Sequence, residues 1–216
     1  EGYYVIGRFL GDGSIFRSKS QDRGISICCN IDDNSVEELS GYMTQMFKRK
    51  PEIVRREDEN LIEVKIHDGG LAKWFRKNTY NEKKEKIVPW NISDLKENYI
   101  RFLLAGILDS DGYIDYNKNI IYLEITSKSM AQLAFLSMSK LGLKPNISWR
   151  DRSDECHVYK NKEVRSTKES FVIRCAGERC RQFISWMKNK TIFFDKTEIE
   201  GSTLATITNI EVDNNT

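Results

Sequence analysis

The stretch FLLAGILDSDGYID, residues 102–115, joins an apolar run rich in small residues to two aspartates and a glycine. The run has the pattern of a helix, so the acidic residues fall where that helix should end. The carboxyl end of a helix carries partial negative charge, and a carboxylate there is repelled unless something positive compensates. Asp109 and Asp111 therefore raise the possibility of a bound cation. The alternative is a polar turn that closes the helix, with Gly112 as a left-handed cap.

A second copy of this stretch lies near the start of the chain. VIGRFLGDG at residues 5–13 aligns with LAGILDSDG at residues 104–112 at a constant offset of 99. The aligned pairs are Gly7 with Gly106, Gly11 with Ser110, Asp12 with Asp111, and Gly13 with Gly112.

The similarity between the two halves continues downstream. SVEELSGYMTQMFKRKPEI at 35–53 parallels SMAQLAFLSMSKLGLKPNI at 129–147. LIEVKIHDGGLAKWF at 61–75 parallels SFVIRCAGERCRQFI at 170–184. An internal repeat therefore organises the sequence.

Each half has the same predicted order of elements, αββαββα, which gives an α/β protein of the α+β type. Alternating runs after each acidic turn indicate β-hairpins, and a helix and a second strand pair follow before a last helix. In the middle helices the apolar positions at helical spacing are Val36, Leu39, Met43 and Met46 in the first half and Leu133, Leu136 and Leu141 in the second. The predicted units are a first half at 1–97, a second half at 98–200 and a short tail at 201–216.

Side-chain size predicts how the repeated helices pack. Gly7 and Gly11 lie on one face of the first repeated helix, and Gly106 and Ser110 lie on one face of the second. Small residues four apart let two helix backbones approach closely. If the helices pack about a pseudo-twofold axis, Asp12 and Asp111 emerge side by side. Two carboxylates at two helix ends then favour a shared divalent metal with oxygen ligands, most simply Mg²⁺.

Composition limits the class of protein. Hydrophobic residues make up 39% of the 216 residues, enough for a core, and no apolar run reaches membrane-spanning length. The net charge of +2 comes from 34 basic and 32 acidic residues and does not by itself identify a partner. Five irregularly placed cysteines indicate small core residues in a reducing, intracellular compartment, and two distant histidines argue against a zinc site.

The paired motifs resemble a known family. LAGILDSDG is similar to the second signature of the LAGLIDADG homing endonucleases. VIGRFLGDG resembles the first signature of their intein-encoded branch, where GDG commonly replaces DADG. The resemblance implies two curved antiparallel sheets that form a DNA-binding saddle, with Asp12 and Asp111 as catalytic and metal-binding carboxylates. Asp109, which aligns with Leu10, is expected to be a structural turn residue.

The resemblance also implies the rest of the site. Backbone oxygens of Gly11 and Ser110 would join the carboxylates around Mg²⁺, and a lysine would lie near each active centre. The sequence KIVP places the first lysine at Lys86, and WMKNKTIFF places the second at Lys190, with Lys188 as its rival. Such a lysine would stabilise charge on the phosphate or poise the attacking water.

Basic side chains in the predicted hairpins are candidate DNA contacts, because a two-stranded ribbon fits the major groove. Surface ion pairs would explain the individual arginines equally well. The candidates are Arg17, Lys19, Arg23, Arg55, Arg56, Arg150, Arg152, Lys160, Lys162, Arg165 and Lys168.

The expected function is a staggered double-strand break in a long, roughly palindromic DNA target, made by a monomer with internal pseudo-twofold symmetry. The tail LATITNIEVDNNT resembles an intein splicing strand, so we expect the endonuclease region of an intein, or a relative that kept this remnant, which would not splice itself. Two alternatives are a catalytically idle nucleic-acid-binding protein of the same fold, such as an RNA maturase or a regulator, and a two-carboxylate hydrolase acting on sugars. The second of these would not explain the repeat.

Overall fold

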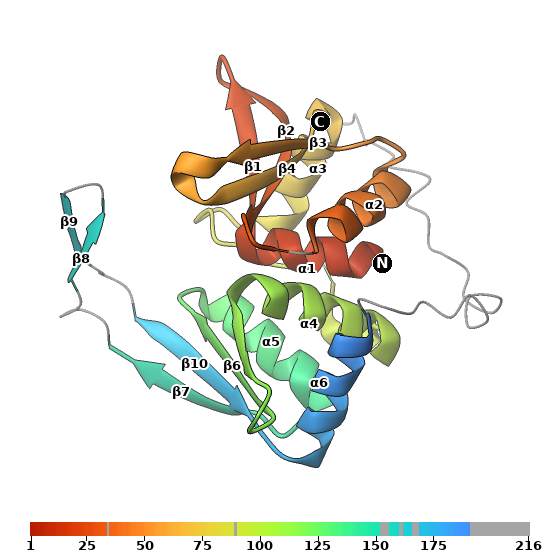
Figure 1. Ribbon diagram of the computed structural model, residues 1–216, viewed down its shortest axis with the longest axis vertical. Helices are drawn as coiled ribbons and strands as arrows, with labels where there is room; N and C mark the ends of the chain where they lie inside the picture. The colour runs from red at the N-terminus through yellow and green to blue at the C-terminus, as the bar shows by residue number, and fades with distance from the viewer. Residues whose placement is uncertain (34, 89, 152–155, 160–161, 166–168, 191–216) are drawn as a thin grey trace.

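The computed structural model describes residues 1–33, 35–88, 90–151, 156–159, 162–165 and 169–190 (Figure 1). Within 156–159, 162–165 and 188–190 the description is of the backbone alone. None of the helices in these ranges is long and apolar enough to cross a membrane.

The first half runs in the predicted order. Its elements are α1 (Gly2–Asp12), β1 (Gly13–Ser18), β2 (Gln21–Asn30), α2 (Val36–Phe47), β3 (Glu52–Arg56), the short 3-10 helix η1 (Glu57–Glu59), β4 (Leu61–Ile66) and α3 (Gly69–Thr79). The strands form an antiparallel sheet in the order β1-β2-β4-β3.

The second half repeats this plan. Its elements are α4 (Glu97–Asp111), β5 (Gly112–Asp115), β6 (Ile120–Ile125), α5 (Lys128–Lys140), β7 (Asn146–Arg150), β8 (Cys156–Tyr159), β9 (Lys162–Arg165), β10 (Ser170–Cys175) and α6 (Glu178–Lys190), and the 3-10 helix η2 (Ile92–Asp94) precedes them. The strand order β5-β6-β10-β7 matches that of the first sheet, with β10 in the place of β4. The predicted α+β fold of two related halves is confirmed.

The second half differs from the prediction in one insertion. The sequence pattern indicated one long strand pair between α5 and α6, but the structure has a separate two-stranded hairpin, β8–β9, between β7 and β10. Residues 151–169 connect those strands, whereas in the first half η1 and Asn60 suffice. A connection between two paired strands does not need to be this long. Part of the longer connection in the second half, β8 and β9, forms a strand pair of its own.

The two halves meet along α1 and α4, which lie side by side at the centre (Figure 1). A Cβ atom on Gly7 would lie 2.2 Å from the carbonyl oxygen of Leu103, and one on Gly106 would lie 2.3 Å from that of Tyr4. Real Cβ atoms do not approach backbone so closely, so only glycine allows this contact. The predicted packing of small residues is confirmed.

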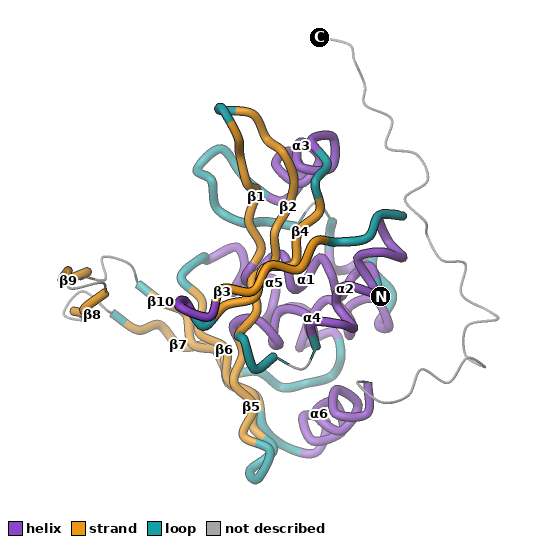
Figure 2. Tube along the Cα trace, turned by 45° about the horizontal axis from the view of Figure 1, so that its top comes forward, coloured by secondary structure: helices purple, strands orange, loops and turns teal. Residues whose placement is uncertain are grey.

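Each sheet buries one face against its own helices. Ile25, Ile27 and Val64 are fully buried in the first half, as are Ile121 and Ile173 in the second. Figure 2 shows the strands of both sheets on the left of the molecule and most helices to the right. We call the face opposite these buried side chains the open face of each sheet, and a DNA-binding saddle would use this face.

One local expectation was wrong, and one alternative is excluded. Leu136 is 54% exposed, because the buried face of α5 is formed instead by Met130, Leu133 and Met138. Gly112 is not a left-handed cap: its φ is −90° and its ψ is 154°, both extended. The chain passes straight from α4 into β5, and glycine is required because a Cβ atom would lie 2.6 Å from the carbonyl oxygen of Leu108.

The cysteines behave as predicted where their side chains are described. Cys28, Cys29, Cys175 and Cys180 are free thiols, and all but the half-buried Cys28 belong to the core.

Candidate active site at the ends of the central helices

The repeated aspartates are the last residues of the two central helices. Asp12 ends α1 and Asp111 ends α4. A Cβ atom on Gly11 would lie 2.2 Å from the Cβ of Ser110 and 3.2 Å from Oδ2 of Asp111. The Asp111 carboxylate therefore lies against the last turn of α1. The structure brings together the two acids that the repeat predicted.

The two carboxylates share an unfavourable electrostatic environment. Both side chains reach solvent. Partial desolvation raises the pKa of Asp12, while the charges of Arg8 and Lys86 oppose this. Desolvation also raises the pKa of Asp111, and the negative charge of Asp12 raises it further. The acids are thus close enough to repel each other, which favours a shared cation.

Lys86 lies at the end of α1, near the acids, as the family resemblance implied. Its ammonium group donates a hydrogen bond to the carbonyl oxygen of Gly11 and lies 5.7 Å from the centre of the Phe9 ring. Burial lowers the pKa of Lys86, while the charges of Asp111 and Asp12 raise it. An ammonium at a helix carboxyl end offsets the negative charge that collects there.

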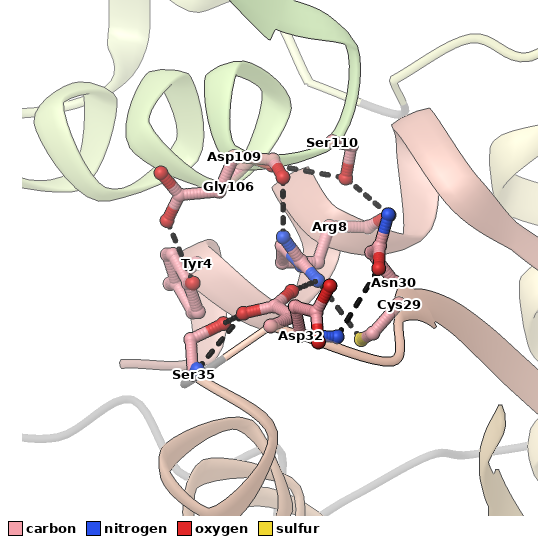
Figure 3. Close-up of polar contacts among 10 residues, drawn as sticks. Tyr4, Arg8, Cys29, Asn30, Asp32, Ser35, Gly106, Asp109 and Ser110 are labelled. Atoms are coloured by element: carbon pink, nitrogen blue, oxygen red, sulfur yellow. Dashed lines mark hydrogen bonds and ion pairs between the residues drawn. The ribbon is translucent and has the colours of Figure 1, made fainter. Parts of the chain in front are cut away.

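Arg8 is a feature of the site that the sequence reasoning missed. Its side chain is buried within α1, one turn before Asp12, and its guanidinium group lies 2.9 Å from a carboxylate oxygen of Asp33. It also donates to the sulfur of Cys29 at 2.9 Å and to the carbonyl oxygen of Asp109 across the helix interface (Figure 3). The signal that could have revealed its role was a charged arginine inside an otherwise apolar repeated helix.

Asp109 has the structural place that was expected of it. Its carboxylate accepts a hydrogen bond of 2.7 Å from the hydroxyl of Tyr4 (Figure 3). This bond joins α1 to α4 before the helix ends. The acidic turn therefore contains one carboxylate that fastens the helices and one, on Asp111, that faces its counterpart.

The donor set fits a hard divalent cation. Asp12 and Asp111 supply carboxylate oxygens, and Gly11 and Ser110 supply backbone carbonyls beside them. Lys86 already occupies one lone pair of the Gly11 carbonyl, and a second lone pair remains. Across the described ranges no three His, Cys, Asp or Glu side chains form a metal-ligating group, so any ion here relies on two carboxylates, backbone and water. Mg²⁺ keeps several waters and suits such a set.

The candidate DNA contacts of the first hairpin lie at its outer end. Arg17 is ion-paired with Asp22 at 2.9 Å, Lys19 lies in the turn, and Arg23 is exposed. Arg76 of α3 also binds Asp22, at 2.5 Å. The hairpin that would enter a groove is thus fastened to the body of the first half.

Arg55 and Arg56 lie on opposite faces of the first sheet. Arg55 pairs in register with the buried Ile62 and lies 3.9 Å from Glu37 of α2, on the helix side. Arg56 lies on the open face and contacts Glu63 at 2.8 Å. The predicted pair therefore cannot contact one groove through the same sheet face.

The open face of the first sheet continues into the acidic site. Burial raises the pKa of Cys28, and the charges of Glu63 and Asp12 raise it further. Lys65 and Arg56 act on the same thiol in the opposite direction. The thiol of Cys28 thus lies within electrostatic range of both the charged open face and Asp12 at the end of α1.

The open face of the second sheet carries basic and aromatic side chains among its described residues. Arg150 is exposed and lies 3.5 Å from Glu124. An aromatic and cationic row that the sequence reasoning missed crosses this sheet: Tyr113 is 64% exposed, its ring centre is 6.1 Å from that of Tyr122, and Arg174 lies 5.7 Å from the Tyr122 ring.

Some of the predicted residues have no side-chain description. Arg152, Lys160 and Lys168 lie outside the described residues, as does the tail at 201–216. For Lys162, Arg165, Lys188 and Lys190 only the backbone is described.

Comparison with known protein families identifies the second half. Residues 98–184 match the family model of the LAGLIDADG-like domain. The second half of this chain is a LAGLIDADG-like domain. The match begins at the start of α4 and ends within α6, so it contains the Asp111 helix and all of the second sheet.

Solved structures share the LAGLIDADG fold over both halves. Mesophilic variants of the homing endonuclease I-DmoI align with a TM-score of 0.57 and 13% identity, covering 86% of this chain and 93% of theirs. I-DmoI in complex with DNA and Ca gives 0.57 at 12% identity, covering 86% and 87%. The N-terminal LAGLIDADG domain of DUF199/WhiA gives 0.50 at 11% identity, covering 91% and 83%. At these identities the likeness shows the fold.

A curated relative is named for an activity other than DNA cleavage. The glutamine--fructose-6-phosphate aminotransferase [isomerizing] of Methanocaldococcus jannaschii is 27% identical over 173 residues. The match covers 77% of this chain but 15% of that protein.

Proposed function

We propose that this chain is a site-specific double-stranded DNA endonuclease that hydrolyses phosphodiesters with the aid of Mg²⁺ and makes a staggered break. The observation that carries the proposal is the pair of carboxylates, one from each half, at adjacent ends of two helices in glycine contact. The LAGLIDADG-like domain and the fold shared with I-DmoI support it. Because one chain supplies both acids, it would act as a monomer.

Each residue of the site has a distinct proposed task. Asp12 and Asp111 each help to hold divalent metal, one acid beside each strand, with the carbonyls of Gly11 and Ser110 beside them. When bound, the cation supplies Lewis-acid stabilisation of phosphate charge and makes water easier to deprotonate. Lys86, fixed at the end of α1, adds a positive charge next to the phosphate and orients water there. The sheets hold the duplex so that one strand passes each acid.

The direct test is cleavage of a plasmid library that carries randomised inserts. The protein is incubated with the library and Mg²⁺, and the linear products are sequenced at their ends. The proposal expects a single preferred site with staggered ends. Intact plasmid, or fragments without a common sequence, would contradict it.

DNA binding is expected to involve the open face of the sheet. Affinity for a long duplex should fall steeply as salt rises, because several basic side chains release counterions from phosphates. Arg56→Ala should weaken binding by about 1–3 kcal/mol if the side chain reads a base, or reduce the salt slope by about 1 if it holds phosphate.

Arg55→Ala is the matched control, because Arg55 lies next in the strand but on the helix side. It should change affinity by less than about 0.5 kcal/mol, as exposed substitutions usually do. Fluorescence anisotropy of a labelled duplex in calcium measures both variants at several salt concentrations. Equal effects of the two substitutions would show that the open face is not the binding surface.

The relation to the aminotransferase suggests where such a nuclease would reside. We propose that the matched segment is an insertion within a host enzyme, as in an intein, because it makes up only 15% of a protein whose name describes other chemistry. A host coding sequence without the insertion should then contain the cleavage target. Cleavage of that DNA at the insertion point supports the idea, and an uncut host sequence contradicts it.

A catalytically idle nucleic-acid-binding protein is the second candidate. The observation in its favour is the shared fold of the DUF199/WhiA LAGLIDADG domain. Loss of one acid would favour this reading, but both Asp12 and Asp111 are present. Specific duplex binding without cleavage in Mg²⁺ or Mn²⁺ would establish it.

A further inference from the structure

Arg8 joins the two halves immediately behind the acidic site. Its guanidinium group contacts the carboxylate of Asp33 and the sulfur of Cys29, both in the first half. Its third partner is the carbonyl oxygen of Asp109, in the last turn of α4 (Figure 3). That carbonyl is one of the helix-end groups without an intrahelical donor. Arg8 thus serves as a cationic cap supplied by the opposite helix.

The contact belongs to one side of the pseudo-twofold axis. In the repeat Arg8 aligns with Ile107, and Asp109 aligns with Leu10, so neither partner has a polar counterpart. The hydroxyl of Tyr4, which binds the Asp109 carboxylate at 2.7 Å, aligns with Leu103. Side chains of the first half therefore hold the last turn of α4. The aligned residues of the second half are aliphatic and cannot make the same polar contacts to α1.

The end of α1 is held in a different way. Lys86 binds the carbonyl of Gly11, and the hydroxyl of Ser110 lies 3.3 Å from the carbonyl oxygen of Arg8. Loss of the Arg8 guanidinium would leave the Lys86 contact in place, because Lys86 binds the main chain of Gly11. The contact from Ser110 comes from the last turn of α4 itself. The main chains of the two helix ends are thus held by different groups, although the charges of Arg8 and Lys86 both act on Asp12 and that of Lys86 also acts on Asp111.

Burial of a guanidinium is costly unless the charge is paired and its donors are used. Here Asp33 pairs the charge, but the carboxylate alone would not require contact with α4. The bond to Asp109 adds a restraint two residues before Asp111. A displacement of about 1 Å at a catalytic group can cost roughly a hundredfold in rate.

We propose that Arg8 is a positioning residue for Asp111: it fixes the last turn of α4 and so sets the geometry of one of the two acids. The effect on the rate rests on the proposed nuclease function, whereas the effect on α4 does not. Arg8 does not contact the reacting atoms. Because Arg8 holds the last turn of α4 and not that of α1, its loss should disturb the two strand cleavages unequally.

Three variants separate the role of Arg8 from simple loss of the fold. Arg8→Met removes the guanidinium group, and the double variant Arg8→Met with Asp33→Asn also removes the carboxylate charge that would be left unpaired. Arg8→Lys keeps the charge but lacks the planar fork that reaches several partners. Arg49→Met is the control, because Arg49 is an exposed arginine paired with Asp68 at 3.3 Å.

The first measurement is hydrogen–deuterium exchange of the full chain, compared between peptides covering residues 104–113 and 5–13. Arg8→Met and the double variant should speed exchange in 104–113 by about tenfold or more and leave 5–13 nearly unchanged. Arg8→Lys should fall between the variants and the parent. Unchanged exchange at 104–113 in a folded Arg8 variant would overturn the proposal, and this readout does not require the chain to cut DNA.

The second measurement follows each strand of a labelled target separately. The strand whose cleavage is lost in Asp111→Asn should be slowed by roughly ten- to a hundredfold in the Arg8 variants, and the other strand by much less. Arg8→Lys should recover part of the loss. Equal slowing of both strands would contradict the proposal. If the parent cuts no DNA, the nuclease function fails and the exchange measurement alone decides the role of Arg8.

Discussion

Asp12→Asn and Asp111→Asn are each expected to abolish double-strand cleavage while leaving DNA binding intact. Asparagine nearly preserves the size of the side chain but removes the charge that holds a divalent metal. Loss of one electrostatic catalytic group typically slows a reaction by roughly a hundred- to a thousandfold. Because each acid serves one strand, a variant should retain a slow nick on the other strand. The assay is conversion of supercoiled target plasmid to nicked and linear forms in Mg²⁺, with binding measured in calcium.

Asp109→Asn provides the matched control for both variants. It lies in the same turn and undergoes the same chemical change, but its side chain accepts a bond from Tyr4, which an asparagine oxygen can also accept. Cleavage should stay within a few-fold of the parent. Full cleavage by Asn at position 12 or 111, or by the parent in chelator, would show that the paired carboxylates are only helix ends.

Gly106→Ala is expected to destabilise the protein, although alanine favours helices. The added Cβ atom would lie 2.3 Å from the carbonyl oxygen of Tyr4 and 2.9 Å from Cα of Gly7, so the central helices must separate. Overpacking of this kind costs about 1–3 kcal/mol or more, and the backbones cannot yield as a flexible side chain could. The gain in helix propensity, about 1 kcal/mol, offsets only part of this cost.

Gly41→Ala is the same substitution in a different environment. Gly41 lies within α2, is exposed, and has no atom within 4 Å of an added Cβ. It should stabilise the protein by up to about 1 kcal/mol. Urea denaturation measures both variants, and opposite signs are the expected result. Stabilisation by Gly106→Ala would show that the helices are not in glycine contact.

The parts of the site that could be predicted from the residues alone are those that occur twice. Gly7 and Gly106 occupy equivalent positions in the repeat, so one steric argument predicts both, and the same holds for Asp12 and Asp111. Lys86 was located by the family resemblance and not by the repeat. The fold followed from the same duplication, because each predicted helix and strand had a copy to support it.

The parts that could not be predicted depend on contacts between distant segments. Arg8 has no polar copy, and its partners Asp33 and Asp109 come together only when α1 packs on α4. Arg55 and Arg56 could not be assigned to faces until β3 took its register on β4, because one residue of slip exchanges the two faces. The β8–β9 hairpin was hidden because alternation marks strands but not how they pair.

The positively charged side chains that bind the two helix ends, Arg8 and Lys86, come from one half of the chain. This limits how the molecule could be rebuilt as a symmetric dimer. Arg8 and Lys86 both belong to the first half, and the positions that align with Tyr4 and Arg8 in the second half are Leu103 and Ile107. Two second halves joined as a homodimer would keep a pair of acids but place aliphatic side chains behind them. Two first halves would keep both cations and a matching pair of glycine helices. Judged by the side chains that the structure describes, which exclude those of Lys188 and Lys190, a minimal symmetric nuclease should therefore be engineered from residues 1–97.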